Sequence, residues 1–246
     1  MSNYHLEVKH VSRGKGHSLA SRINYITGRP IRDTYLDKTY YDMRRDVLYV
    51  KVLLPEGAPS AFQDLNYLCR AMDCAERRWD ARTARSLTGS LPNELTLPEW
   101  TQIVEEFVKH NFVDYGLCAI AAIHQGKNPQ DPQRDNPHVH ILVSTRTAGP
   151  DGFKAHKARE YDKKDVLQRF REDWARTQNR AYERNGISTR VSHKSLEEQG
   201  IDRVPMGHLS HIEWQRERTK SGDRQKENRR RNLYRQEHDR QPERSR

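Results

Sequence analysis

Residues 117–146, LCAIAAIHQGKNPQDPQRDNPHVHILVSTR, decide the fold around which the rest of the chain is arranged. The first eight, 117–124, form a continuous apolar run of the kind found in a central strand. Residues 138–146 form a second apolar run typical of a strand, and the residues between the runs are rich in turn formers. The two runs predict an antiparallel hairpin with a long polar connection.

Three histidines lie at one end of this predicted hairpin. His124 ends the first strand, and His138 and His140 begin the second. Alternate side chains of a strand point to the same face, so His138 and His140 project together. Three imidazole ligands that leave coordination positions open suit a catalytic divalent metal, whereas solvated or hydrogen-bonded structural histidines are the alternative.

Apolar spacing outside the hairpin predicts an α+β domain. The expected strands are 4–11, 46–55 and 87–96, and the expected helices are 19–28, 96–112 and 162–186. Residues 60–86 contain neither proline nor glycine and have apolar residues at helical spacing. They predict one long helix, or two with a bend, and residues 195–205 predict a short capped helix and a turn.

The composition changes at about residue 213. From there to residue 246 the chain is almost wholly charged or polar, so it cannot bury much surface and is expected to be a solvated helix or a disordered tail. We therefore expect a domain over 1–212 and a basic extension over 213–246. The whole chain of 246 residues has a net charge of +10, which fits either an ordinary basic surface or a nucleic-acid-binding one.

The three cysteines form no CxxC pair, which argues against a disulfide framework or a cysteine-rich zinc site. The N-terminus lacks the apolar core of a signal peptide, and no apolar run approaches the roughly 20 residues of a membrane span. The sequence therefore predicts a soluble cytoplasmic protein with no membrane insertion.

The position of one tyrosine suggests a reaction that the metal would assist. Tyr25 lies on the predicted helix after the first strand, beside Arg22 and the basic loop 12–18. A divalent metal acts as a Lewis acid on phosphate oxygens, and a tyrosine that attacks phosphorus forms a covalent phosphotyrosine. A packed aromatic side chain is the alternative role of Tyr25.

Four blocks of sequence, in order, carry a resemblance to a known family. They are YHLEVKHVSRGKGHSLASRINYITG (4–28), ARTARSLTGSLPNELT (81–96), AAIHQGK with DNPHVHILVSTR (121–146) and SLEEQGIDRVP (195–205). Together they resemble the MobA/MobL plasmid mobilization relaxases, which belong to the HUH endonucleases, named for histidine–hydrophobic–histidine. The resemblance runs over nearly all of residues 4–209.

The resemblance implies a central antiparallel sheet flanked by helices, with a divalent metal (Mn²⁺ or Mg²⁺) over the sheet and single-stranded DNA in a cleft. It implies that Tyr25 cleaves one strand at an origin of transfer (oriT), stays on the 5′ phosphate and later allows rejoining. His124, His138 and His140 would be the metal ligands. It also implies relaxosome accessory proteins, a coupling protein, and a bacterial cytoplasmic protein that is transferred with the DNA.

The chain departs from the family pattern at one point. Ser86 and Thr88 stand where relatives commonly carry a carboxylate that could orient a histidine or receive the tyrosine proton. Asp33, Asp42 and Asp46 are the candidate substitutes.

Two other functions fit parts of the sequence. Residues 161–164, YDKK, match the Tyr-x-x-Lys pattern of rolling-circle replication initiators, in which Tyr161 would be the nucleophile and Lys164 would lie beside the phosphate. A basic nucleic-acid-binding protein with structural histidines would need no nucleophile.

DNA contacts are expected mainly through phosphates, so that affinity falls steeply with salt. The candidate contacts are Arg13, Lys15, Arg22, Lys127, Arg134 and the tail 216–246, and the candidate base-stacking aromatics are Tyr4, Tyr35, Tyr40 and Trp79. Ordinary solvated charges are the alternative for each cation.

Overall fold

The computed structural model describes residues 4–127 and 135–201. The chain divides into two compact units, Met1–His193 and Lys194–Arg246, and the second is described only as far as Ile201. The predicted extension 213–246 therefore lies outside the described residues.

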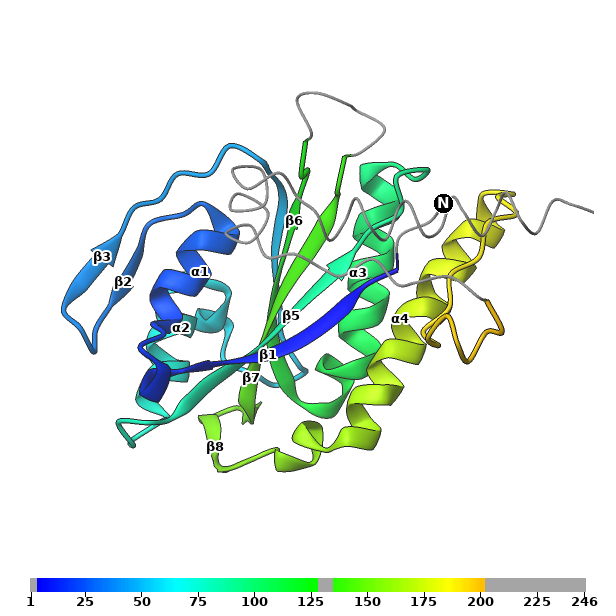
Figure 1. Cartoon of the computed structure of the whole chain (residues 1–246). Coiled ribbons are helices and arrows are strands. Elements are labelled where there is room, and N and C mark those ends of the chain that lie inside the picture. Colours follow the sequence, from blue (N-terminus) through cyan, green and yellow to red (C-terminus); the bar gives the residue numbers. More distant parts are fainter. Residues whose placement is uncertain (1–3, 128–134, 202–246) are drawn as a thin grey trace, which may run out of the picture. The chain divides into compact units, whose positions relative to one another are not determined.

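A six-stranded antiparallel sheet forms the centre of the first unit (Figure 1). The strand order is β1-β5-β7-β6-β4, and β8 pairs with β7. The strands are β1 (Leu6–Ser12), β4 (Val47–Leu53), β5 (Arg82–Ser90), β6 (Leu117–His124), β7 (His138–Gly149) and β8 (Gly152–Lys157). The predicted central hairpin is confirmed, because β6 and β7 are neighbours and every residue of β6 is buried.

Two helices cover each face of the sheet, as Figure 1 shows. The helices are α1 (Leu19–Thr27), α2 (Leu65–Cys74), α3 (Leu97–Asn111) and α4 (Lys164–Arg184). Val139 and Ile141 of β7 pack in the core with α3 and α4, and Leu142 packs in the core with α1 and α2. Since side chains alternate along a strand, His138 and His140 share the face of Leu142, on the side of α1.

Short-range capping explains where α1 begins and ends. The hydroxyl of Ser18 accepts a hydrogen bond from the backbone N–H of Ser21, which caps the first turn. Gly28 ends the helix with φ 63°, a left-handed conformation that glycine adopts without a steric penalty. A Cβ at Gly28 would lie 3.2 Å from the carbonyl oxygen of Arg44, so glycine also lets the segment before β4 approach the helix.

The predicted helix over 60–86 is wrong in its second half. A 3-10 turn at Ser60–Gln63 leads into α2, which ends at Cys74, and β5 begins at Arg82. Seven of the nine residues of β5 are buried, so the strand lacks the alternation that would have marked it. The predicted strand 87–96 overlaps β5 only at residues 87–90.

Gly89 of β5 permits the close packing of α4, because a Cβ there would lie 2.8 Å from the ring of Trp174.

Other elements were also missed or misjudged. The small hairpin of β2 (Ile31–Asp33) and β3 (Lys38–Tyr40) and the strand β8 were not predicted. Residues 195–199 form a hydrogen-bonded turn instead of the predicted helix, with Ser195 and Glu198 capping each other. The other predicted helices agree with the structure to within a few residues.

Candidate metal centre

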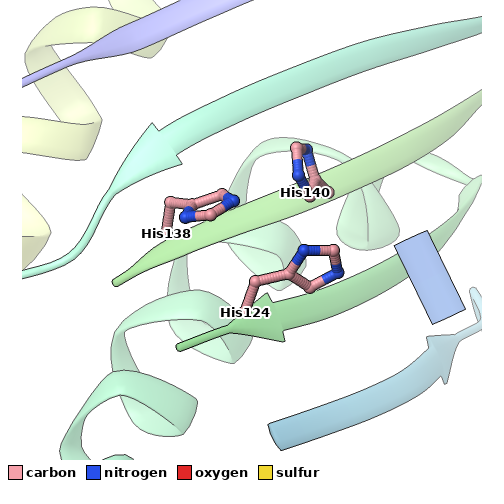
Figure 2. Close-up of side chains that lie close together, drawn as sticks. All are labelled: His124, His138 and His140. Carbon is pink, nitrogen blue, oxygen red and sulfur yellow. The ribbon is translucent and has the colours of Figure 1, made fainter. Parts of the chain in front are cut away.

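The three predicted ligands meet on one face of the central hairpin (Figure 2). His124 lies directly opposite His138 in the β6–β7 register, and His140 follows two residues along the same face. Their ring centroids lie 4.7–5.3 Å apart. One nitrogen from each ring lies within 4.8 Å of the other two. They are the one group of this kind among the residues that the structure describes.

Hydrogen bonds fix which nitrogen two of the rings present. Nε2 of His124 donates to the carbonyl of Ile26 at 2.8 Å, and Nδ1 of His138 donates to the carbonyl of Asn136 at 2.7 Å. A carbonyl only accepts, so each ring carries its proton on the bonded nitrogen and leaves a lone pair on the other one. Such bonds to backbone carbonyls commonly orient metal-binding histidines.

The third ring lies between a hydroxyl and a guanidinium. Nδ1 of His140 is 3.1 Å from Oγ1 of Thr88 and 3.3 Å from Nη2 of Arg22. Burial lowers the pKa of His124, His138 and His140, and the neighbouring guanidinium of Arg22 lowers that of His140 further. All three rings are therefore neutral at neutral pH, the state that ligates metals.

The donor set fits a divalent cation. Nδ1 of His124 and Nε2 of His140 are buried and have no hydrogen-bond partner among the residues that the structure describes. A buried polar nitrogen without a partner is unfavourable, and two beside a third imidazole are explained if a cation binds between them. The three histidines leave further coordination positions for oxygen ligands, as in catalytic metal sites.

Tyr25 lies beside this cluster. Ile23 and Ile26 of α1 are buried in the core, which leaves Tyr25 between them on the exposed side, 38% accessible. Its ring centroid is 5.8 Å from that of His140 and 6.2 Å from that of His124. The structure therefore brings together the predicted nucleophile and the predicted ligands.

Two guanidinium groups flank the ring of Tyr25. Cζ of Arg44 lies 4.4 Å from the ring centroid, and Cζ of Arg22 lies 5.2 Å from it. Sequence reasoning missed Arg44, because nothing in the local pattern shows that the segment before β4 folds onto α1. Two positive charges close to the phenol suit the binding of an anion there.

Asp46 is the one candidate carboxylate placed near the histidines. Its Oδ2 is 3.9 Å from Nδ1 of His124, and its carboxylate accepts two hydrogen bonds from Arg44, at 2.8 and 2.6 Å. These bonds raise the pKa of Arg44 and lower that of Asp46. Asp33 instead accepts bonds from the hydroxyl of Ser18 and two backbone N–H groups, a structural role.

The positions that lack a carboxylate hold hydroxyls aimed at the site. Thr88 lies opposite His140 in the β5–β7 register, and the hydroxyl of Ser86 accepts a hydrogen bond from Arg22 at 3.3 Å. Glu7 lies opposite Thr88 in the edge strand β1 and forms an ion pair with Lys9. A carboxylate is thus one strand farther from His140 than the family pattern predicts.

The predicted DNA-contacting residues differ in whether their side chains are available to bind DNA. The four terminal N–H groups of Arg13 donate to Asp73 and to the carbonyls of Asp73, Glu76 and Arg78, so this side chain holds its loop to the end of α2. Lys15 and Lys127 are exposed, and Arg134 lies outside the described residues.

The candidate stacking aromatics also differ in access. Tyr35 and Trp79 are exposed, and Tyr40 is half-buried. Tyr4 is half-buried and donates a hydrogen bond from its hydroxyl to the carbonyl of Arg171.

Tyr161 is placed away from this site. It is buried in the core on the α3 and α4 side of the sheet, stacked on Phe170, with the guanidinium of Arg85 over its ring. Burial raises the pKa of Tyr161 to about 12. The initiator hypothesis that used Tyr161 as nucleophile is therefore wrong, because this tyrosine lies on the opposite face from the histidines.

Comparison with known sequences gives consistent matches. A model of the MobA/MobL family matches residues 17–219. A probable mobilization protein MobA from Bifidobacterium longum is 33% identical, over 85% of this chain and 43% of the relative. Mobilization protein MobL from Acidithiobacillus ferridurans is 27% identical, over 85% and 62%. Mobilization protein A from Escherichia coli is 31% identical, over 85% and 29%. This chain spans less than two thirds of each of these curated relatives.

Solved structures share the fold. A structure described as the molecular basis of vancomycin resistance transfer in Staphylococcus aureus has a TM-score of 0.71 at 26% identity, over 78% of this chain and 98% of that one. The Mn-bound MobM relaxase domain with oriT DNA has a TM-score of 0.51 at 12% identity, over 87% and 100%. TrwC with a 27-mer DNA also has 0.51, at 11% identity, over 76% and 72%. This chain therefore shares its fold with the MobM relaxase domain and with TrwC.

Proposed function

Because the chain belongs to the MobA/MobL family of mobilization proteins, we propose that it nicks one strand of plasmid DNA at an origin of transfer by tyrosine transesterification. The observation that carries this proposal is the position of Tyr25. Its ring lies about 6 Å from the rings of His124 and His140, and the guanidinium groups of Arg22 and Arg44 lie close to it.

The reaction exchanges one phosphate ester for another. The phenolic oxygen of Tyr25 attacks phosphorus, the bond from phosphorus to the 3′ oxygen breaks, and the 5′ phosphate remains on the tyrosine. The proton lost by the phenol balances the proton gained by the departing 3′-OH. Since no phosphate-ester bond is lost overall, the reverse attack by a 3′-OH rejoins the strand.

His124, His138 and His140 would hold a divalent cation, Mn²⁺ or Mg²⁺, through their free nitrogens. Bound there, the cation would supply Lewis-acid stabilisation of a non-bridging phosphate oxygen. The guanidinium groups of Arg22 and Arg44 would bind the phosphate electrostatically and stabilise negative charge on the phenolic oxygen. Burial of the three imidazoles keeps them neutral and available as ligands.

The structural relatives support oriT DNA as the substrate class. The MobM relaxase domain is bound to oriT DNA and Mn, and TrwC is complexed with DNA that comprises a recognition hairpin and a cleavage site. We propose the same class of substrate for this chain, with phosphate contacts from exposed cations such as Lys15 and Lys127. The described helices include none long and apolar enough to cross a membrane.

The roles of the rest of the chain extend this proposal. Residues 1–212 would carry the nicking and rejoining activity, and the basic extension 213–246 would contact DNA or partner proteins. Relaxosome accessory proteins and a coupling protein would be the partners, and the protein would act in the bacterial cytoplasm and be transferred with the DNA.

The test is covalent capture of DNA. Labelled single-stranded oligonucleotides that span a candidate origin are incubated with Mn²⁺, Mg²⁺ or EDTA, and a protein–DNA adduct is sought by denaturing electrophoresis. We expect an adduct with metal for the wild type and for Tyr67→Phe, an exposed tyrosine on α2, and none for Tyr25→Phe. An adduct that survives Tyr25→Phe, or DNA binding without any cleavage, contradicts the proposal.

A further inference from the structure

Arg22 is a cation that forms no ion pair with any residue that the structure describes. Its side chain is half-buried, and burial lowers the pKa of its guanidinium. Within the described part of the chain no carboxylate forms a salt bridge with it, although the charge of Glu7 nearby raises its pKa. Its hydrogen-bond contacts are the hydroxyl of Ser86 and Nδ1 of His140, both at 3.3 Å. Arg44, by contrast, is paired with Asp46. A partly desolvated charge that no carboxylate contacts directly is unfavourable, so this position favours the arrival of an anion.

The contact with His140 has a chemical consequence. A guanidinium has donors and no acceptor, so it can bond Nδ1 of His140 only while that nitrogen carries a lone pair. The proton of the neutral ring is then on Nε2, the buried atom for which the described part of the chain supplies no partner. A cation needs the lone pair on Nε2. Arg22 in this position therefore stabilises the tautomer of His140 that does not bind metal.

Thr88 allows the other tautomer. A hydroxyl both donates and accepts, so Oγ1 of Thr88 can bond Nδ1 of His140 in either protonation pattern. Once Arg22 moves away, Nδ1 can carry the proton and donate it to Thr88, and Nε2 is free to ligate. His124 and His138 need no such change, because backbone carbonyls already fix their tautomers.

We propose that a hydrogen bond from Arg22 to Nδ1 of His140 and metal binding to Nε2 of the same ring exclude each other. Bound DNA shifts this equilibrium toward metal binding. This inference rests on the proposed function, because the anion that draws Arg22 away is the scissile phosphate. Arg22 and Tyr25 are three residues apart on α1 and share a face, so a phosphate at Tyr25 is within reach of the Arg22 side chain. DNA and metal then strengthen each other's binding, and the coupling is reciprocal.

The first test measures Mn²⁺ affinity by electron paramagnetic resonance of the free ion, in a Tyr25→Phe background that cannot react. Arg22→Met removes the competitor, and Arg70→Met, an exposed position on α2, removes the same charge elsewhere. Without DNA, we expect Arg22→Met to bind Mn²⁺ on the order of tenfold more tightly than Arg70→Met, the worth of one charged hydrogen bond. An oriT oligonucleotide should tighten Mn²⁺ binding more in Arg70→Met than in Arg22→Met, because a phosphate oxygen can ligate the cation in both variants but displaces Arg22 only in Arg70→Met.

The second test separates the tautomer from simple charge repulsion. Long-range ¹H–¹⁵N spectra of the metal-free protein distinguish a protonated from an unprotonated ring nitrogen, with His140 assigned by its absence in His140→Asn. We expect the proton on Nε2 in the wild type and in Arg70→Met, and on Nδ1 in Arg22→Met.

Two outcomes overturn the inference: a His140 proton on Nδ1 in the wild type, or Mn²⁺ binding by Arg22→Met no tighter than by the control. Either leaves the proposed nicking reaction intact if wild-type protein still forms the Tyr25 adduct. Loss of that adduct in wild-type protein is the separate failure of the proposed function.

Discussion

The carbonyl of Ile26, the residue that follows Tyr25 on α1, accepts a hydrogen bond from Nε2 of His124 at 2.8 Å. The helix that carries the proposed nucleophile therefore also sets the tautomer and orientation of a proposed metal ligand. His124 is fully buried, so water cannot compete for this hydrogen bond. Nucleophile and ligand are positioned by adjacent residues of one helical turn.

Metal binding should stabilise the fold through the three histidines. At a free Mn²⁺ concentration of about 100 times the Kd, the gain in free energy of unfolding is about 2.7 kcal/mol. For a domain of this size that raises the melting temperature by roughly 5–10 °C. Thermal scans with and without Mn²⁺ should show this rise in the wild type and in His156→Ala, an exposed histidine on β8, and should not show it in His124→Ala. An equal rise in His124→Ala would place the cation elsewhere.

Thr88→Val should weaken metal binding. The change keeps the shape of the side chain and removes the hydroxyl that accepts the Nδ1 proton of His140 in the metal-binding tautomer. Loss of such an outer hydrogen bond costs about 10- to 100-fold in metal affinity. Thr101→Val, which removes a hydroxyl bonded within α3, is the control and should change Mn²⁺ affinity little in the same titration. Equal affinities in the two variants would mean that Thr88 does not support His140.

Gly126→Ala should disturb His138 through the backbone. Gly126 has φ 58°, and a Cβ there would lie 2.0 Å from the carbonyl oxygen of Asn136, the acceptor of the His138 hydrogen bond. We expect weaker Mn²⁺ binding together with some loss of stability. Gly186→Ala is the matched control: its φ is 66°, but its Cβ would meet nothing within 4 Å. Both variants should carry the strain of a left-handed alanine, but only Gly126→Ala should bind Mn²⁺ more weakly in a titration.

Asp162 should make stability depend on acid pH. Burial opposes its ionisation, but hydrogen bonds from His10 and Arg85 lower the pKa of Asp162 to about 2, below its ordinary value of 3.8. A lowered carboxyl pKa stabilises the fold above pH 3.8, and this contribution is lost as the pH falls toward 2. The difference corresponds to about 2 kcal/mol.

Asp162→Asn should therefore lower the free energy of unfolding at pH 7 by about 2 kcal/mol, because it leaves the buried Arg85 without its ion pair. The deficit relative to wild type should shrink in urea titrations near pH 2.5. Asp151→Asn, an exposed residue between β7 and β8, should show no such deficit at either pH. A deficit of the same size at both pH values would mean that the charge is not its cause.

Local patterns were sufficient to predict the centre of the fold. The apolar run 117–124 and the turn-rich connection define the β6–β7 hairpin without any other part of the chain, and the register of that hairpin alone brings His124 opposite His138. Likewise, Ser18 and Gly28 mark the ends of α1 by capping chemistry that is local. The ligand cluster was predictable because its geometry depends on one hairpin.

Tertiary contacts determine what the sequence did not reveal. The first half of β5 was taken for a helix because the strand is buried on both sides, by α1 and α2 on one side and by Trp174 of α4 on the other. Arg44 and Asp46 reach the site only because Gly28 admits the Arg44 backbone and because the N–H of Gln125 donates to the carbonyl of Asp46. Neither contact has a periodic or motif-like signature.

The histidines lie on two interior strands of the sheet. β7 is held between β5 and β6, and β6 between β7 and β4, so neither strand has an open edge along the paired residues near the cluster. Interior strands open only when the whole sheet does, whereas surface loops open far more often. The lifetime of the cation-binding geometry is therefore set by the unfolding rate of the domain, and local breathing around it leaves the three ligand positions in register.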